Sequence, residues 1–67
     1  MSISGKDLEA VIQKVKAFCT EEGFEFYNSS MRISQEKSEC LFVLDNSLKR
    51  VYLVFTFYGG KIKMKQE

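Results

Sequence analysis

The sequence predicts an α+β fold in which an N-terminal helix packs on one face of a 3–4-stranded antiparallel β-meander, in the order α-β-β-β-β or α-β-β-β. The observations that predict it are apolar residues at helical spacing near the N-terminus, alternating apolar runs after them, and a Gly-Gly pair between the last two runs. A chain of 67 residues is expected to form a single domain, residues 1–67. Its apolar content of 45% suits a compact core and argues against disorder.

The first regular element is expected to be a helix from Gly5 to Glu22. Its apolar residues recur at the spacing of one helical face: Leu8, Val11, Ile12, Val15, Phe18 and Cys19. Ser4 is a suitable N-cap, and Gly23 suits the left-handed conformation that often ends a helix. Glu21 and Glu22 oppose the helix dipole, so we expect them either to be solvated or to face a partner.

The strands are expected after the helix. Residues 24–27 alternate between apolar and polar and are predicted to form the first strand, with a turn at residues 28–30. Residues 31–33 either continue that strand or form a short separate one. Residues 40–44 are apolar on both sides, which is typical of a central strand, but the polar turn at residues 45–49 leaves open which side faces the helix.

The clearest local pattern is a β-hairpin near the C-terminus. Residues 51–58 and 61–65 alternate, and Gly59 and Gly60 between them favour a two-residue turn, in which both central residues need a positive φ. This turn predicts the pairs across the hairpin: Phe57 with Ile62 and Phe55 with Met64 on one face, and Tyr58 with Lys61, Thr56 with Lys63 and Val54 with Lys65 on the other. The first face is apolar, and the second mixes tyrosine with lysine.

A single helix covers only one face of a sheet, and this leads to the main functional prediction. We expect the helix to cover the apolar face of the hairpin: Val51, Leu53, Phe55, Phe57, Ile62 and Met64. The opposite face then stays open, together with either Phe42 and Leu44 or Leu41 and Val43. Because a monomer seldom exposes a contiguous apolar face without a use, this face is predicted to bind a protein partner or a second copy. The predicted surface consists of Tyr52, Val54, Thr56, Tyr58 and Phe42.

The charge of the chain is unevenly distributed. The net charge is only +1, but residues 46–66 contain basic residues and no acidic residue. This segment predicts a patch for an anionic partner: Lys49, Arg50, Lys61, Lys63 and Lys65. The alternative interpretation is that the lysines protect an edge strand from aggregation.

The residue types that catalysis and metal binding need are scarce. Histidine is absent, and the two cysteines, Cys19 and Cys40, are far apart and form no CxxC motif. Both lie in apolar runs, which raises a thiol pKa, and we expect them to be reduced rather than joined in a disulfide. Ser34 and Lys37 match an SxxK pattern, but its companion motifs are missing. We therefore predict no enzyme activity, no catalytic residue, no metal site, no cofactor and no small-molecule substrate.

The sequence itself does not name a function, and two hypotheses follow from the predicted surfaces. The first is a small non-enzymatic binding or regulatory protein, similar in size to inhibitors encoded by phages or mobile elements, that acts on a protein partner and forms a homodimer. The alternative is a nucleic-acid-binding protein that stacks bases on the tyrosines and holds phosphates with the lysines of the same face. No apolar run of signal-peptide or membrane-spanning length is present, so we expect a cytoplasmic protein that does not bind membranes.

Two short segments, Ser4-Gly5-Lys6-Asp7-Leu8 and Gly23-Phe24-Glu25, resemble the N-terminal part of the small HicA toxins. The order of a helix followed by a meander is also similar to that of double-stranded-RNA-binding folds. The catalytic histidine of the toxins has no counterpart in this chain, so the resemblance transfers no site residue. We therefore assign no family from the sequence.

Overall fold

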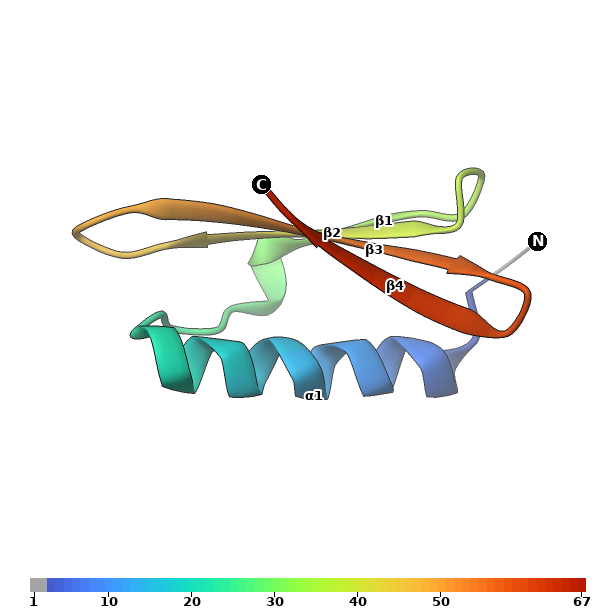
Figure 1. Cartoon of the computed structure of the whole chain (residues 1–67), viewed down its shortest axis with the longest axis horizontal. Coiled ribbons are helices and arrows are strands. Elements are labelled where there is room, and N and C mark those ends of the chain that lie inside the picture. Colours follow the sequence, from blue (N-terminus) through green and yellow to red (C-terminus); the bar gives the residue numbers. More distant parts are fainter. Residues whose placement is uncertain (1–2) are drawn as a thin grey trace.

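A helix and a sheet form two layers in the computed structural model, which describes residues 3–67 (Figure 1). The helix, α1 (Gly5–Glu22), runs beneath a four-stranded antiparallel sheet with the strand order β1-β2-β3-β4. The remaining elements are a short 3-10 turn, η1 (Asn28–Ser30), and the strands β1 (Met31–Ser34), β2 (Glu39–Asp45), β3 (Arg50–Tyr58) and β4 (Lys61–Gln66). The predicted α+β fold, with one helix on one face of a meander, is confirmed.

Local signals in the sequence set both ends of α1, as predicted. The hydroxyl of Ser4 accepts a hydrogen bond from the backbone N–H of Asp7 at 3.1 Å, which satisfies a free donor of the first turn. At the other end Gly23 has a φ of 78°, and the N–H groups of Gly23 and Phe24 both donate to the carbonyl of Cys19, at 3.0 and 2.9 Å. In residues 3–67, no helix has both the length and the apolar character needed to cross a membrane.

The segment between α1 and β1 differs from the prediction. Residues 24–27, predicted as the first strand, belong to no strand and lead into η1. Phe24 is buried and stacks on Phe18, with ring centroids 6.0 Å apart. Phe26 packs against the ring of Phe42 at 6.1 Å. Alternation indicates that one side of a segment is buried, but it does not require hydrogen bonds to another strand. The first strand is therefore β1, which is separate from residues 24–27.

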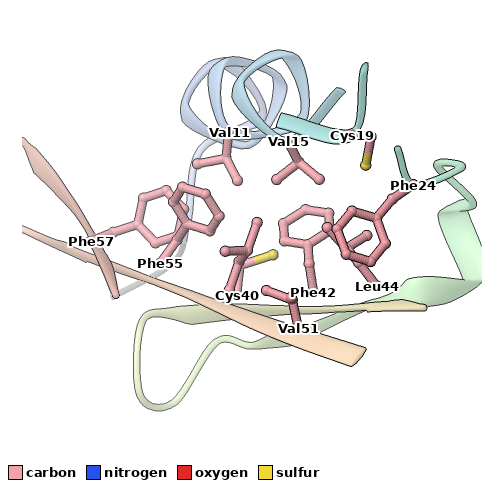
Figure 2. Close-up of a cluster of buried hydrophobic side chains, with 11 residues drawn as sticks. Val11, Val15, Cys19, Phe24, Cys40, Phe42, Leu44, Val51, Phe55 and Phe57 are labelled. Atoms are coloured by element: carbon pink, nitrogen blue, oxygen red, sulfur yellow. The ribbon is translucent and has the colours of Figure 1, made fainter. Parts of the chain in front are cut away.

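The core lies between α1 and the sheet (Figure 2). Val11, Val15 and Cys19 point from the helix toward side chains of β2 and β3. The buried apolar residues are Val11, Val15, Cys19, Phe24, Cys40, Phe42, Leu44, Val51, Leu53, Phe55 and Phe57. Phe42 and Phe55 meet edge to face among them, with ring centroids 5.8 Å apart. Because no polar residue in the described part of the chain is buried, apolar packing holds the two layers together.

The register of β2 settles which side of residues 40–44 faces the helix. Leu41 pairs with Val54, and Phe42 pairs with Leu53. Because paired residues of an antiparallel ladder share a face, Phe42 lies with buried Leu53 on the helix side and Leu41 lies on the opposite side. The prediction that Phe42 belongs to the partner-binding surface is therefore wrong: its side chain is 0% exposed and forms part of the core.

The β3–β4 hairpin has the predicted turn and register. Gly59 and Gly60 have φ values of 59° and 74°, and all the predicted pairs are present. Ile62 packs against the core as expected, but Met64 is 54% exposed, so its predicted burial against the helix is wrong. The buried residues of the sheet come from β2 and β3, and the edge strand β4 extends past the area that α1 covers.

Candidate functional site

The face of the sheet that points away from α1, here called the outer face, has no second layer among residues 3–67 (Figure 1). Strand register determines its members, because paired side chains share a face and alternate along each strand. It consists of Arg32, Ser34, Glu39, Leu41, Val43, Asp45, Arg50, Tyr52, Val54, Thr56, Tyr58, Lys61, Lys63 and Lys65. Tyr52, Val54, Thr56 and Tyr58 lie where the sequence analysis placed them, whereas Phe42 does not.

The middle of the outer face is apolar. Leu41 and Val54 are paired across β2 and β3, and Val43 is paired with Tyr52 beside them. The three aliphatic side chains are half-buried by their neighbours, and Tyr52 is 38% exposed. We call these four residues the apolar centre. Leu41 and Val43 were one of the two pairs predicted for this face, since the choice depends on the register of β2.

Basic residues border the apolar centre on both edge strands. Arg32 of β1 is paired with Leu41, and Lys65 of β4 is paired with Val54, so one row across the sheet has a cation at each end. The outer face of β4 carries a row of lysines, which we call the lysine strip: Lys61, Lys63 and Lys65. The position of Arg32 on the outer face was not predicted, because the sequence left open whether residues 31–33 form a strand of their own.

The lysine strip lies beside an exposed aromatic ring. Tyr58 is 61% exposed, and the ammonium of Lys63 lies 5.7 Å from the centre of its ring, which is a cation–π distance. Lys65 forms an exposed ion pair with Glu67 at 3.4 Å. In the part of the chain that the structure describes, neither Lys61 nor Lys63 has an ion pair. Their charge is therefore available to the carboxylates of a partner.

The structure does not bring together all the basic residues that were predicted to form one anionic-partner patch. Lys49 lies at the end of α1, where its Nζ is 3.6 Å from Glu22 and 5.7 Å from the centre of the Phe24 ring. Arg50 lies at the far end of β3 from the strip and donates to Asp45 at 2.7 Å; this hydrogen bond raises the pKa of the guanidinium. Only the lysine strip is continuous, and Glu22 has an intramolecular partner that the sequence did not indicate.

The loop between β2 and β3, which contains Lys49, is organised by Asn46. Oδ1 of Asn46 accepts hydrogen bonds from the N–H groups of Leu48 and Lys49, at 2.8 and 2.9 Å. Its Nδ2 donates to the carbonyl of Gly23 at 3.1 Å, which joins the loop to the end of α1. Leu48 remains at the loop tip and is 89% exposed. The available sequence signal was an asparagine directly after an apolar strand, a residue type that often organises turns.

The two cysteines offer no reactive thiol. Cys19 and Cys40 are both free and buried. Burial raises the pKa of Cys40 to about 11, and it also raises the pKa of Cys19. Both thiols are protonated at neutral pH, and a protonated thiol is a poor nucleophile and a poor metal ligand. Within residues 3–67, no three side chains of His, Cys, Asp or Glu are placed to hold a metal ion.

The outer face thus combines an apolar centre with a charged rim. This arrangement is the usual anatomy of a protein–protein interface, in which apolar contact is surrounded by polar and charged residues. Comparison of the chain with protein-family models, with curated proteins and with solved structures found no match in any of the three.

Proposed function

We propose that this protein is a small non-enzymatic regulator of the inhibitor type, which acts in the cytoplasm and binds a protein partner through the outer face of its sheet. The observation that supports the proposal is the position of the apolar centre between Arg32 and the lysine strip, on a face without a second layer. Such a face suits a partner that presents apolar residues next to carboxylates. The free, buried cysteines suit a reducing compartment.

Burying the apolar centre against a partner is favourable in free energy. Removing apolar surface from water is favourable by about 25 cal/mol per Å². A partner seated on the apolar centre would gain this free energy without burying an unpaired charge, because the cations lie at its border and not within it. The cations would then pair with carboxylates at the rim, where they favour fast association and the correct partner.

A nucleic acid is the second candidate, supported by the position of Tyr58 beside the lysine strip. Three observations favour a protein instead. Lys63 lies over the Tyr58 ring on which a base would stack, and both Lys49 and Arg50 are paired with carboxylates of the chain itself. The middle of the face is also mainly aliphatic, whereas base stacking uses aromatic rings.

The homodimer predicted from the sequence remains part of the proposal, since a second copy is the available occupant of the outer face when no partner is present. Sedimentation velocity over a range of micromolar concentrations tests it. We expect a shift toward a dimer at the higher concentrations, and we expect Val54→Lys to abolish the shift. A monomer at every concentration would remove the homodimer and would leave the partner-binding proposal intact.

The proposal is tested by capture from a lysate of the host, with and without nuclease treatment, with three tagged proteins: the natural chain, Val54→Lys and Thr20→Lys. Both variants add one positive charge, but Val54 lies in the apolar centre and Thr20 is exposed on the helix. We expect a protein that the natural chain and Thr20→Lys retain equally and that Val54→Lys retains at least 10-fold less. Equal retention by all three proteins would contradict the proposal. Retention that nuclease abolishes would favour the nucleic-acid candidate.

A further inference from the structure

The edge of the sheet at β4 is a second open feature, and it borders the outer face. β4 (Lys61–Gln66) has β3 as its only neighbour in the sheet order. Figure 1 shows no other part of the described chain along the edge of β4 that points away from β3. The opposite edge strand, β1 (Met31–Ser34), is shorter and follows directly on η1. The longer of the two edges therefore lies next to the lysine strip.

The hydrogen bonds of the hairpin show which backbone groups of β4 face this edge. Tyr52 and Glu67 exchange two bonds, N–H of Tyr52 to the carbonyl of Glu67 at 3.0 Å and N–H of Glu67 to the carbonyl of Tyr52 at 2.8 Å. In an antiparallel ladder every second residue bonds to the same neighbour, so the odd-numbered residues of β4 bond to β3. The backbone N–H and C=O groups that face the free edge belong to Ile62, Met64 and Gln66.

The side chains of β4 are sorted by the same alternation. The lysine strip lies on the outer face, and Ile62 and Met64 lie on the helix side, where Met64 is 54% exposed. A strand placed along this edge would therefore meet cations on one face and apolar side chains on the other, at alternate positions.

We propose that β4 accepts an extended segment of the partner protein as an added strand, in which acidic residues alternate with apolar residues. The inference rests on the proposed function, because it describes how the same protein partner reaches the border of the outer face. Backbone hydrogen bonds to Ile62 and Met64 hold the segment, and its carboxylates lie beside the lysine strip. Its apolar side chains lie on the helix side and cover the exposed part of Met64.

Charge disfavours antiparallel pairing with β4 of a second copy. In an antiparallel β4–β4 pair the outer faces of the two copies lie on the same side of the joined sheet, so the lysine strip of one copy would lie beside the lysine strip of the other. Like charges opposite each other destabilise such a pair, and edge lysines are a known means of preventing self-association. The same lysines attract an acidic strand, so at this edge they favour the partner segment over an antiparallel strand from a second copy.

The test uses three synthetic peptides as probes at low salt: Ser-Glu-Val-Glu-Val-Glu-Ser, its counterpart with Lys in place of each Glu, and the block-ordered Ser-Glu-Glu-Glu-Val-Val-Ser. Amide hydrogen exchange is followed by NMR. With saturating alternating acidic peptide, we expect exchange at the amides of Ile62, Met64 and Gln66 to slow at least 10-fold. The amides of Lys63 and Lys65, which already bond to β3, should change little. We expect no such alternating protection from the other two peptides.

Met64→Pro supplies a second measurement, with Met64→Ile as its matched control. The proline removes an N–H that faces the free edge and breaks no bond to β3, whereas isoleucine keeps both the N–H and an apolar side chain. We expect Met64→Pro to weaken binding of the acidic peptide at least 10-fold and Met64→Ile to change it less than 3-fold. If the proline variant does not fold, the exchange pattern of the natural chain decides alone.

The outcomes separate this inference from the proposed function. No exchange protection by the acidic peptide at millimolar concentration overturns strand addition. Binding that perturbs Leu41 and Val54 without protecting Ile62 and Met64 overturns it as well, and equal binding of the lysine peptide overturns the charge requirement. In each case the capture experiment with Val54→Lys still decides whether the outer face binds a protein.

Discussion

The two faces of the sheet are built from alternate residues of the same strands, yet only one of them is a core. In β2, Phe42 and Leu44 point toward α1 and are buried, whereas Leu41 and Val43 point away and are half-buried. All four residues are strongly apolar, so hydrophobicity does not distinguish the faces. The difference is the covering layer, because the described chain has one helix and it lies on one side. The apolar centre of the outer face is therefore left without a covering layer in the described chain.

The largest effect that tests this comparison comes from truncating neighbouring residues on opposite faces. Phe42→Ala is expected to lower the free energy of unfolding by about 3–5 kcal/mol, because it removes a fully buried ring that packs against Phe55. Leu41→Ala is expected to cost about 1 kcal/mol, since its side chain is only half-buried. Urea unfolding followed by circular dichroism measures both. Equal losses would show that the outer face is covered in solution, and the comparison would fail.

A smaller effect is expected at Asn46, which joins the β2–β3 loop to the end of α1. Asn46→Ala removes the hydrogen bonds to Leu48, Lys49 and Gly23, and it is expected to lower the free energy of unfolding by about 2 kcal/mol. Ser47→Ala, in the same exposed loop, serves as the control and should change it by less than about 0.5 kcal/mol. The same urea unfolding measures both variants. If Asn46→Ala behaves like its control, the hydrogen bonds of Asn46 do not stabilise the fold.

The features that the sequence predicted correctly depend on residues close to one another in the chain. Ser4 and Gly23 set the ends of α1 through hydrogen bonds within one turn. Gly59 and Gly60 set the hairpin, because a two-residue turn with positive φ at both positions leaves one register for its strands. The same register placed Tyr52 and the other predicted outer-face residues of β3 correctly. Local chemistry was sufficient in each of these cases.

The features that were missed depend on contacts between distant segments. Whether Phe42 faces the helix depends on how β2 pairs with β3, and both sides of residues 40–44 are apolar in the sequence. The packing of residues 24–27 depends on a core that forms only when the helix and the sheet meet. Lys49 does not lie with the other basic residues of the predicted patch. It lies at the end of α1, where it pairs with Glu22. A pattern of residue types does not specify which distant side chain each residue will contact.

A pH dependence sharpens the description of the helix-side face. Burial raises the pKa of Cys40 from 9.0 to about 11, so the unfolded chain loses this thiol proton before the folded chain does. The contribution of the buried, protonated Cys40 thiol to the free energy of unfolding is fully present below pH 9 and is lost as the pH rises toward 11. We expect the free energy of unfolding to fall by about 1 kcal/mol more between pH 8 and pH 10 in the natural chain than in Cys40→Ala, as measured by urea unfolding. Identical pH profiles for the two proteins would show that water reaches the thiol.

The smallest expected effect separates the lysine that stabilises the fold from those of the strip. Lys49→Met removes an exposed ion pair with Glu22 and should lower the free energy of unfolding by about 0.2–1 kcal/mol, less at high salt. Lys63→Met should change it by less than about 0.5 kcal/mol, because Lys63 has no ion pair among the described residues. Urea unfolding at low and high salt measures both. If Lys63→Met lowers the free energy of unfolding more than Lys49→Met does, the lysine strip stabilises the sheet. If it costs nothing, any loss of partner binding in Lys63→Met reports on the interface, because the fold has not changed.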